Sequence, residues 1–139
     1  MHTLTICKSC NTLNKIESSK ALTKTPVCGK CGKEINLHGL VSEVNADQFK
    51  RIIAKSDKPV IVDFWASWCG PCKMYGPEFE AASKQNTGAV FLKVNTEANQ
   101  ALSSELGIRS IPCTIVYQAG KEVRRQNGAM NAQQVNQLI

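Results

Sequence analysis

The sequence has 139 residues, of which 42% are hydrophobic, so it can bury one ordinary core plus a small second module, and a disordered chain is excluded. It has no run of about 18 apolar residues and does not begin with a basic segment followed by an apolar one, so it predicts neither a membrane span nor a signal peptide. The net charge is +6, and residues 1–40 contain six lysines and two glutamates. The same residues contain no aromatic side chain on which a base could stack, so this charge does not indicate a nucleic-acid partner.

The chain contains seven cysteines and no visible export signal. We therefore expect a cytoplasmic location, where thiols stay reduced and structural disulfides are rare. Cysteines in such a compartment point to metal binding or redox catalysis rather than to a disulfide framework.

The first predicted module spans residues 1–38 and contains two cysteine pairs, "CKSC" and "CGKC". Two residues separate the cysteines of each pair and 17 separate the pairs, which is typical of four thiolates that bind one zinc ion. Asn11, Gly29 and Gly32 can take the positive φ that such paired turns need. The predicted zinc ligands are Cys7, Cys10, Cys28 and Cys31. Two disulfides, or four free thiols, are the alternatives.

The second predicted module, residues 41–139, alternates strand and helix patterns. A short strand begins it, and a helix capped by Asn45 or Asp47 follows. Next, the apolar run "PVIVDFWA" predicts a central strand that is covered on both faces. This run contains a single charge, Asp63, and an unpaired buried charge is costly, so a functional role is expected for it.

After this strand, a helix is predicted from about residue 69 to residue 85, with Pro71 in its first turn and Pro77 at a kink. The next strand is "AVFLKVN", which contains Lys93, and the next helix is "NQALSSELG". The chain ends with a hairpin in "CTIVYQAGKEVRRQNG" and a helix in "NAQQVNQLI". This order predicts an α/β fold, a mixed central sheet flanked by helices on both faces.

The third cysteine pair, in "WCGPCK", lies in a different context from the first two. It directly follows the buried strand and opens a helix, so backbone N–H groups and the helix dipole can stabilise a thiolate at Cys69. Cys72 lies on the same helix face and can attack a mixed disulfide formed at Cys69. A zinc site would need two more ligands, which no further pair supplies. The sequence therefore favours redox chemistry over a purely structural pair.

Residues 41–139 resemble thioredoxin throughout, on the motifs "VDFWASWCGPCK", "VNTEAN", "GIRSIP" and "NGAM". With the four cysteines before them, the chain is similar to the bacterial thioredoxins that carry a zinc-binding N-terminal extension. The resemblance implies a thioredoxin fold preceded by a zinc-ribbon-like module, and protein-disulfide reductase activity. It implies disulfide-containing substrate proteins and an NADPH-dependent thioredoxin reductase as partners. Neither a nucleotide nor a flavin is expected to bind this chain.

The resemblance also implies roles for individual residues. Cys69 is the exposed nucleophile and Cys72 the resolving thiol. Asp63 is the buried carboxylate that handles the proton of Cys72, and Lys93 is its partner lysine. The peptide bond before Pro112 is expected to be cis. Substrate binding is implied for Trp68, Gly70, Pro71, Ile111, Pro112 and Gly128.

The chain departs from the family pattern at Cys113, because the residue after the cis-proline is usually Thr. One interpretation is a small thiol that packs in a strand. The other is a seventh thiol close enough to Cys69 or Cys72 to exchange with them.

Two alternatives to a reductase remain open at this point. A thiol oxidase or isomerase would use the same pair, although Pro71 and the expected cytoplasmic location favour the reducing direction. A zinc-ribbon adaptor that recruits a partner protein would use the pair only to sense oxidants, and it would not turn over a protein disulfide.

Overall fold

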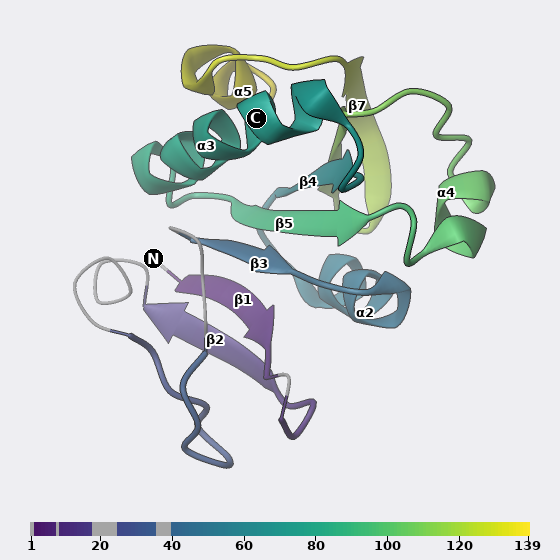
Figure 1. Ribbon diagram of the computed structural model, residues 1–139. Coiled ribbons are helices and arrows are strands. Elements are labelled where there is room, and N and C mark those ends of the chain that lie inside the picture. The colour runs from purple at the N-terminus through teal and green to yellow at the C-terminus, as the bar shows by residue number, and fades with distance from the viewer. Residues whose placement is uncertain (1, 8, 18–24, 36–39) are drawn as a thin grey trace.

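The computed structural model describes residues 2–7, 9–17, 25–35 and 40–139 (Figure 1). Its centre is a five-stranded mixed sheet with the strand order β3–β5–β4–β6–β7. The strands are β3 (Val41–Glu43), β4 (Val60–Trp65), β5 (Val90–Asn95), β6 (Cys113–Gln118) and β7 (Lys121–Asn127). The first three in the sheet are parallel, whereas β6 and β7 are each antiparallel to the preceding neighbour. The predicted mixed α/β sheet is confirmed.

Helices cover both faces of the sheet, as the order of elements predicts. The helices are α2 (Ala46–Lys55), α3 (Gly70–Gln85), α4 (Gln100–Glu105) and α5 (Ala132–Gln137). Figure 1 shows α3 and α5 together on one face and α2 on the other. Asn45 is the N-cap of α2, and its side chain accepts a hydrogen bond from the Gln48 N–H at 2.9 Å. Helix α3 continues through Pro77.

The central strand β4 packs on both of its faces, because it is an apolar run of β-branched and aromatic residues. On the α2 face, Phe49 and Phe64 meet edge to face with ring centroids 6.0 Å apart. On the α3 face, Ile61 of β4 belongs to the cluster in which Phe79 of α3 and Phe91 of β5 meet in the same way at 5.2 Å. Packing from both sides fixes the end of β4, which leads directly into the third cysteine pair.

The N-terminal segment contains an antiparallel hairpin, β1 (His2–Ile6) and β2 (Leu13–Glu17), which the sequence analysis did not predict. Leu4 and Ile6 join the same hydrophobic cluster as Phe49 of α2. The segment therefore packs on the larger sheet domain through apolar side chains.

Two polar contacts join the same parts of the chain. The Ser42 hydroxyl donates to Thr5 Oγ1 at 2.9 Å, between β3 and β1. The Arg51 guanidinium of α2 donates to the Asn11 carbonyl at 3.4 Å. The predicted boundary between residues 38 and 41 falls where residues 36–39 lie outside the described part of the chain, so the division into two modules stays a prediction.

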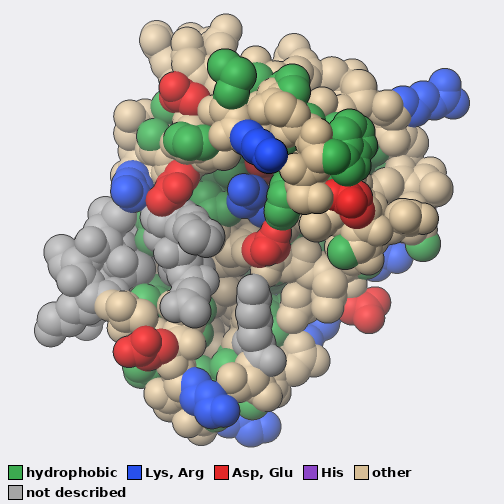
Figure 2. Space-filling model, viewed as in Figure 1, with side chains coloured by type: hydrophobic (Ala, Val, Ile, Leu, Met, Phe, Trp, Pro, Cys, Tyr) green, Lys and Arg blue, Asp and Glu red, His purple; other side chains and the backbone are tan. Residues whose placement is uncertain are grey.

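The surface mixes charges of both signs. Figure 2 shows basic and acidic side chains interspersed over the face in view, rather than gathered in a stripe of one sign. Within the described ranges, no helix has the length and apolar character that crossing a bilayer requires.

Candidate functional site

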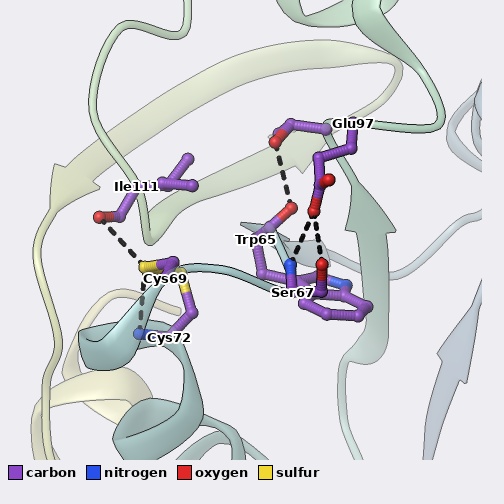
Figure 3. Close-up of a disulfide and its surroundings, with 7 residues drawn as sticks. Trp65, Ser67, Cys69, Cys72, Glu97 and Ile111 are labelled. Carbon is purple, nitrogen blue, oxygen red and sulfur yellow. Dashed lines mark hydrogen bonds between the residues drawn. A yellow bond between two sulfur atoms is a disulfide. The ribbon is translucent and has the colours of Figure 1, made fainter.

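The third cysteine pair lies at the first turn of α3, as predicted. Cys69 is the N-cap, with an extended backbone (φ −87°, ψ 111°), and its Sγ accepts a hydrogen bond from the Cys72 N–H at 3.2 Å. A disulfide joins Cys69 and Cys72, whose Cα atoms are 5.3 Å apart (Figure 3). Pro71 fits here because the first residues of a helix have no intrahelical partner for their N–H groups.

A loop that arrives from α4 faces the disulfide. The Ile111–Pro112 peptide bond is cis, as expected, and the Ile111 carbonyl oxygen lies 3.7 Å from Cys69 Sγ. The Gly128 N–H donates to the Pro112 carbonyl at 2.8 Å, and the φ of Gly128 is +94°, a value that favours glycine. The structure therefore brings Gly128 beside the cis-proline, at the end of the sheet where the disulfide lies.

The exposure that we expected for Cys69 is wrong in the disulfide state, whereas its role as the nucleophile stays a prediction. Cys69 and Cys72 are each only 4% exposed, because they pack in one small cluster with Ala66 and, at its edge, Trp65. The exposed group beside them is Trp68, at 69%. The Trp68 ring is therefore available for contact with a partner that binds near the disulfide.

Asp63 lies in the middle of β4, opposite Lys93 on β5 and Thr114 on β6. It is fully buried, and within the described part of the chain neither carboxylate oxygen has a hydrogen-bond partner. Burial raises the pKa of Asp63 to about 7, and the charge of Lys93 opposes this rise. A carboxyl group with such a pKa can take up or release a proton near neutral pH.

Lys93 reaches the solvent side of the same region. Its ammonium nitrogen lies 4.9 Å from the centroid of the Trp65 ring, a cation–π distance. A cavity of about 320 Å³ extends along α3 and is lined by both of these residues, by Cys72 and by Glu80. This cavity therefore gives solvent a path toward Cys72.

The segment after β5 is tied to the segment that precedes Cys69 (Figure 3). Thr96 donates to the Trp65 carbonyl through its N–H at 2.8 Å and its hydroxyl at 3.0 Å. Ser67 donates to Glu97 Oε1 through its N–H at 2.8 Å and its hydroxyl at 2.7 Å. These bonds lower the pKa of Glu97. No role was predicted for this segment, "VNTEAN", although the motif itself was the available signal.

Cys113 packs away from the redox pair. It begins β6 opposite Phe64, is 1% exposed, and belongs to the hydrophobic cluster on the α2 face of the sheet. Burial raises the pKa of its thiol, so the reactive thiolate is disfavoured. This position agrees with the packing interpretation of Cys113.

The four N-terminal cysteines form one cluster. Their Sγ atoms all lie within 4.8 Å of one another, and no disulfide joins them. Cys7 and Cys31 have an Sγ–Sγ distance of 3.6 Å, and so do Cys10 and Cys28. Tetrahedral thiolates at the usual zinc–sulfur length of about 2.3 Å have sulfurs about 3.8 Å apart. The cluster can therefore bind a metal ion of zinc's size.

Local turns build this cluster, with one correction to the expected geometry. Asn11 and Gly32 have positive φ, 61° and 76°, but Gly29 does not. The Gly29 N–H instead donates to the Asn14 side chain at 3.0 Å, which keeps its backbone in an ordinary conformation. The Asn14 side-chain amide donates a hydrogen bond to the Cys28 sulfur at 3.5 Å.

Hydrogen bonds favour a thiolate at two cysteines of the cluster. Those with Thr12 lower the pKa of Cys10. The Cys31 backbone, the Asn14 side chain and the Lys30 backbone lower the pKa of Cys28 to about 6. At Cys31 a hydrogen bond from the Lys33 backbone acts in the same direction, but burial and the three other thiols outweigh it and raise the pKa to about 11. Four close sulfurs cannot all ionise without a cation, so this donor set suits a divalent metal.

Comparisons with known proteins agree with the geometry. A sequence model of the thioredoxin family, described as "Thioredoxin", matches residues 40–139. Thioredoxin C-3 of Corynebacterium nephridii is 40% identical over 134 residues, covering 96% of this chain and 91% of that protein. A thioredoxin of Streptomyces clavuligerus is 41% identical over 91 residues, covering 66% of this chain and 85% of its own length.

A solved structure of Plasmodium falciparum thioredoxin is similar in fold. It has a TM-score of 0.65 and 38% identity, and the match covers 70% of this chain and 94% of that one. The similarity to Thioredoxin C-3 extends over nearly the whole chain, including the four-cysteine segment. This chain belongs to the thioredoxin family, as a thioredoxin-type disulfide oxidoreductase whose redox-active pair is Cys69 and Cys72.

Proposed function

We propose that this protein is a cytoplasmic protein-disulfide reductase whose N-terminal cysteines bind one zinc ion. The Cys69 thiolate attacks a substrate disulfide, which forms a mixed disulfide and releases one substrate thiolate. The Cys72 thiolate then attacks the Cys69 sulfur, which forms the Cys69–Cys72 disulfide and releases the second substrate thiol. Two electrons pass to the substrate, and an NADPH-dependent thioredoxin reductase returns two electrons to the pair.

The observation that carries this proposal is the disulfide at the start of α3 with the cis-proline loop opposite it. As the N-cap, Cys69 is the cysteine whose sulfur receives a backbone N–H, and the helix dipole favours its thiolate. Cys72 lies inside the first turn, where its sulfur is suited to attack Cys69 rather than a bulky substrate.

Asp63 is proposed to accept the Cys72 proton as that thiol becomes the attacking thiolate. Its support is a pKa of about 7, which lets the carboxylate take a proton and give it up near neutral pH. Lys93 moderates this pKa by its charge and lines the cavity that leads to solvent.

Substrate proteins are proposed to dock on the surface around the pair. Its residues are Trp68, Gly70, Pro71, Ile111, Pro112 and Gly128. The support is the exposed indole of Trp68 next to Cys69, and the Ile111 carbonyl 3.7 Å from the Cys69 sulfur. An exposed aromatic ring next to the reacting atom is typical of a docking surface.

Zinc is proposed as the resident metal because an all-sulfur donor set of four is the usual structural zinc site. When bound, the ion cross-links the two turns and holds their four thiolates. The residues Cys7, Cys10, Cys28 and Cys31 fill all four positions of such a site, so the metal is structural or redox-responsive rather than catalytic.

The test couples the protein to NADPH and a thioredoxin reductase and follows NADPH consumption with insulin as the disulfide substrate. Zinc content is measured on the same sample. Sustained turnover that depends on both cysteines of the pair, with one zinc per chain, is expected. An absence of turnover would contradict the reductase and favour the adaptor. In a separate assay with glutathione disulfide as the oxidant and no NADPH, rapid oxidation of a reduced substrate by a protein that does not turn over insulin would favour an oxidase instead.

A further inference from the structure

Helix α3 contains a buried tyrosine, Tyr75, that has no role in the reaction described above. It lies three residues after Cys72, so the two side chains share one face of the helix. Tyr75 is fully buried, and its hydroxyl forms a hydrogen bond of 2.7 Å with Thr114 Oγ1. Burial raises the pKa of Tyr75, so the phenol stays neutral.

Thr114 is the cross-strand neighbour of Asp63 in the antiparallel pairing of β6 with β4. Side chains that lie opposite each other in such a pairing point to the same face of the sheet, with Cβ atoms about 5 Å apart. A hydroxyl group is therefore within reach of the buried carboxylate. Even so, neither Asp63 oxygen has a hydrogen-bond partner in the described part of the chain, and the Thr114 hydroxyl is engaged by Tyr75 instead.

The charged and titratable groups around Asp63 come from three elements. Lys93 of β5 opposes the rise in the Asp63 pKa that burial causes. Tyr75 of α3 and Cys113 of β6 also interact with the Asp63 charge, but burial raises both pKa values and keeps both groups neutral. On the α3 side, the cavity beside Lys93 is lined by further titratable side chains, namely Cys72, Lys73 and Glu80. A hydrogen bond from Thr114 would add to the effect of Lys93 and make Asp63 a weaker base.

We propose that Tyr75 is a positioning residue for the redox reaction: it holds the Thr114 hydroxyl away from Asp63, so that the carboxylate stays a base strong enough to accept the Cys72 proton. The proposal rests on the proton transfer proposed for Asp63 above. A buried hydroxyl that loses its partner is costly, so removal of the phenol oxygen should make Thr114 turn about its Cα–Cβ bond to another acceptor. The carboxylate opposite it on β4 is that acceptor.

Three variants separate this arrangement from a general effect of polarity. Tyr75→Phe removes only the phenol oxygen and should lower the Asp63 pKa by about one unit, because a donated hydrogen bond favours the ionised carboxylate. Loss of a polar group without such a rearrangement would raise the pKa instead. Thr114→Val and the double variant Tyr75→Phe/Thr114→Val lack the hydroxyl that would donate. Both should therefore keep the Asp63 pKa within about 0.3 unit of the wild type.

The first measurement is the pKa of Asp63 itself, from the carboxyl ¹³C shift of the oxidised full-length protein labelled at aspartate. The chain contains three aspartates, and the signal that is absent from Asp63→Asn identifies Asp63. Tyr117→Phe is the matched control, because the Tyr117 hydroxyl is also buried but its side chain packs on the α2 face of the sheet. This control should leave the Asp63 pKa at the wild-type value of about 7.

The second measurement is the rate at which Cys72 resolves a mixed disulfide between Cys69 and a peptide thiol. Acid quenching and mass spectrometry follow the decay of this species between pH 6 and 8. A base weakened by one pKa unit accepts a proton about threefold more slowly, but it is ionised at a lower pH. Compared with the wild type, Tyr75→Phe should therefore be about threefold slower at pH 8 and about twofold faster at pH 6.

An Asp63 pKa that stays unchanged or rises in Tyr75→Phe overturns the proposal, and so does an equal fall in the double variant. A rise in Thr114→Val would mean that Thr114 already donates in the wild type, which also overturns it. A lower pKa in Tyr75→Phe with an unchanged pH profile of resolution overturns the role in the reaction. If no mixed disulfide forms at Cys69 at all, the reductase function is contradicted, whereas the Asp63 titration still tests Tyr75, so the two failures are distinguishable.

Discussion

Replacing Asp63 with Asn should stabilise the oxidised protein at alkaline pH, because the fold buries this carboxylate. The side chain is 0% exposed, and both carboxylate oxygens lack a partner in the described part of the chain. Burial raises its pKa from 3.8 to about 7, against the opposing charge of Lys93. Ionised Asp63 is therefore less favourable in the folded protein than in the unfolded chain.

The magnitude follows from the two pKa values. The interval from 3.8 to about 7 corresponds to about 4 kcal/mol of differential stability. Because the folded pKa is the higher one, the contribution of Asp63 to stability is complete below the unfolded pKa of about 4. It falls as the pH rises from about 4 to 7 and is lost above about 8. Asn does not titrate, so the variant avoids this loss.

The informative quantity is the pH dependence of the difference between variant and wild type. A buried Asn amide without partners has its own cost of about 1 to 3 kcal/mol, which is independent of pH in this range. The variant should therefore be equal to or less stable than the wild type near pH 4.5. It should gain on the wild type by about 3 to 4 kcal/mol between pH 4.5 and 8.5.

Urea unfolding of the oxidised proteins, followed by far-UV circular dichroism at five pH values over this range, measures the difference directly. Asp57→Asn, at an exposed position, controls for the loss of one negative charge. A difference between Asp63→Asn and wild type that stays within about 1 kcal/mol from pH 4.5 to 8.5 would refute the unpaired burial of this carboxylate.

Three further predictions concern the redox pair and the N-terminal segment. Cys72→Ser should accumulate mixed disulfides with substrate proteins on non-reducing gels, whereas Cys69→Ser should not; equal trapping by both would contradict the assignment of Cys69 as nucleophile. Removing the metal with a chelator should lower the thermal midpoint and make four more thiols titratable in the oxidised protein. If these four thiols react as fast in the untreated protein as after chelation, a metal-bound cluster is contradicted. Deleting residues 1–38 should leave a domain that still reduces disulfides, but its free energy of unfolding should fall by roughly 3 kcal/mol because Leu4 and Ile6 leave the core; an unchanged urea midpoint would contradict their contribution.

The sheet domain was predictable because its signals are local. The run that became β4 is apolar except for Asp63, which predicts a central strand, and the "WCGPCK" motif that follows it predicts the start of the next helix. The N-cap position of Cys69 followed from these two facts. Its low exposure did not, because the covering of Cys69 depends on a loop that returns to the site from residue 111, far along the chain.

The bonds between Ser67 and Glu97 illustrate a second limit. The two residues are 30 positions apart, and both are exposed polar side chains of common types. Nothing in either local pattern indicates a partner, since periodicity reports burial rather than polar pairing. Only the parallel pairing of β4 with β5, whose ends lie at the same edge of the sheet, brings these two residues together.

The N-terminal hairpin was missed for a chemical reason. Its second strand alternates, but one of its buried positions is Asn14, so the apolar pattern is broken. Asn14 is buried because its side chain donates to the Thr12 carbonyl and accepts from the Gly29 N–H, which ties the strand to the second cysteine turn. Asn14 thus breaks the apolar pattern that would have predicted the strand, and the same residue joins the strand to the cysteine cluster. Leu4 of the paired strand also packs in the core of the sheet domain. Metal binding and core packing therefore stabilise the same hairpin, so loss of the metal should weaken the packing, and loss of the packing should weaken metal binding.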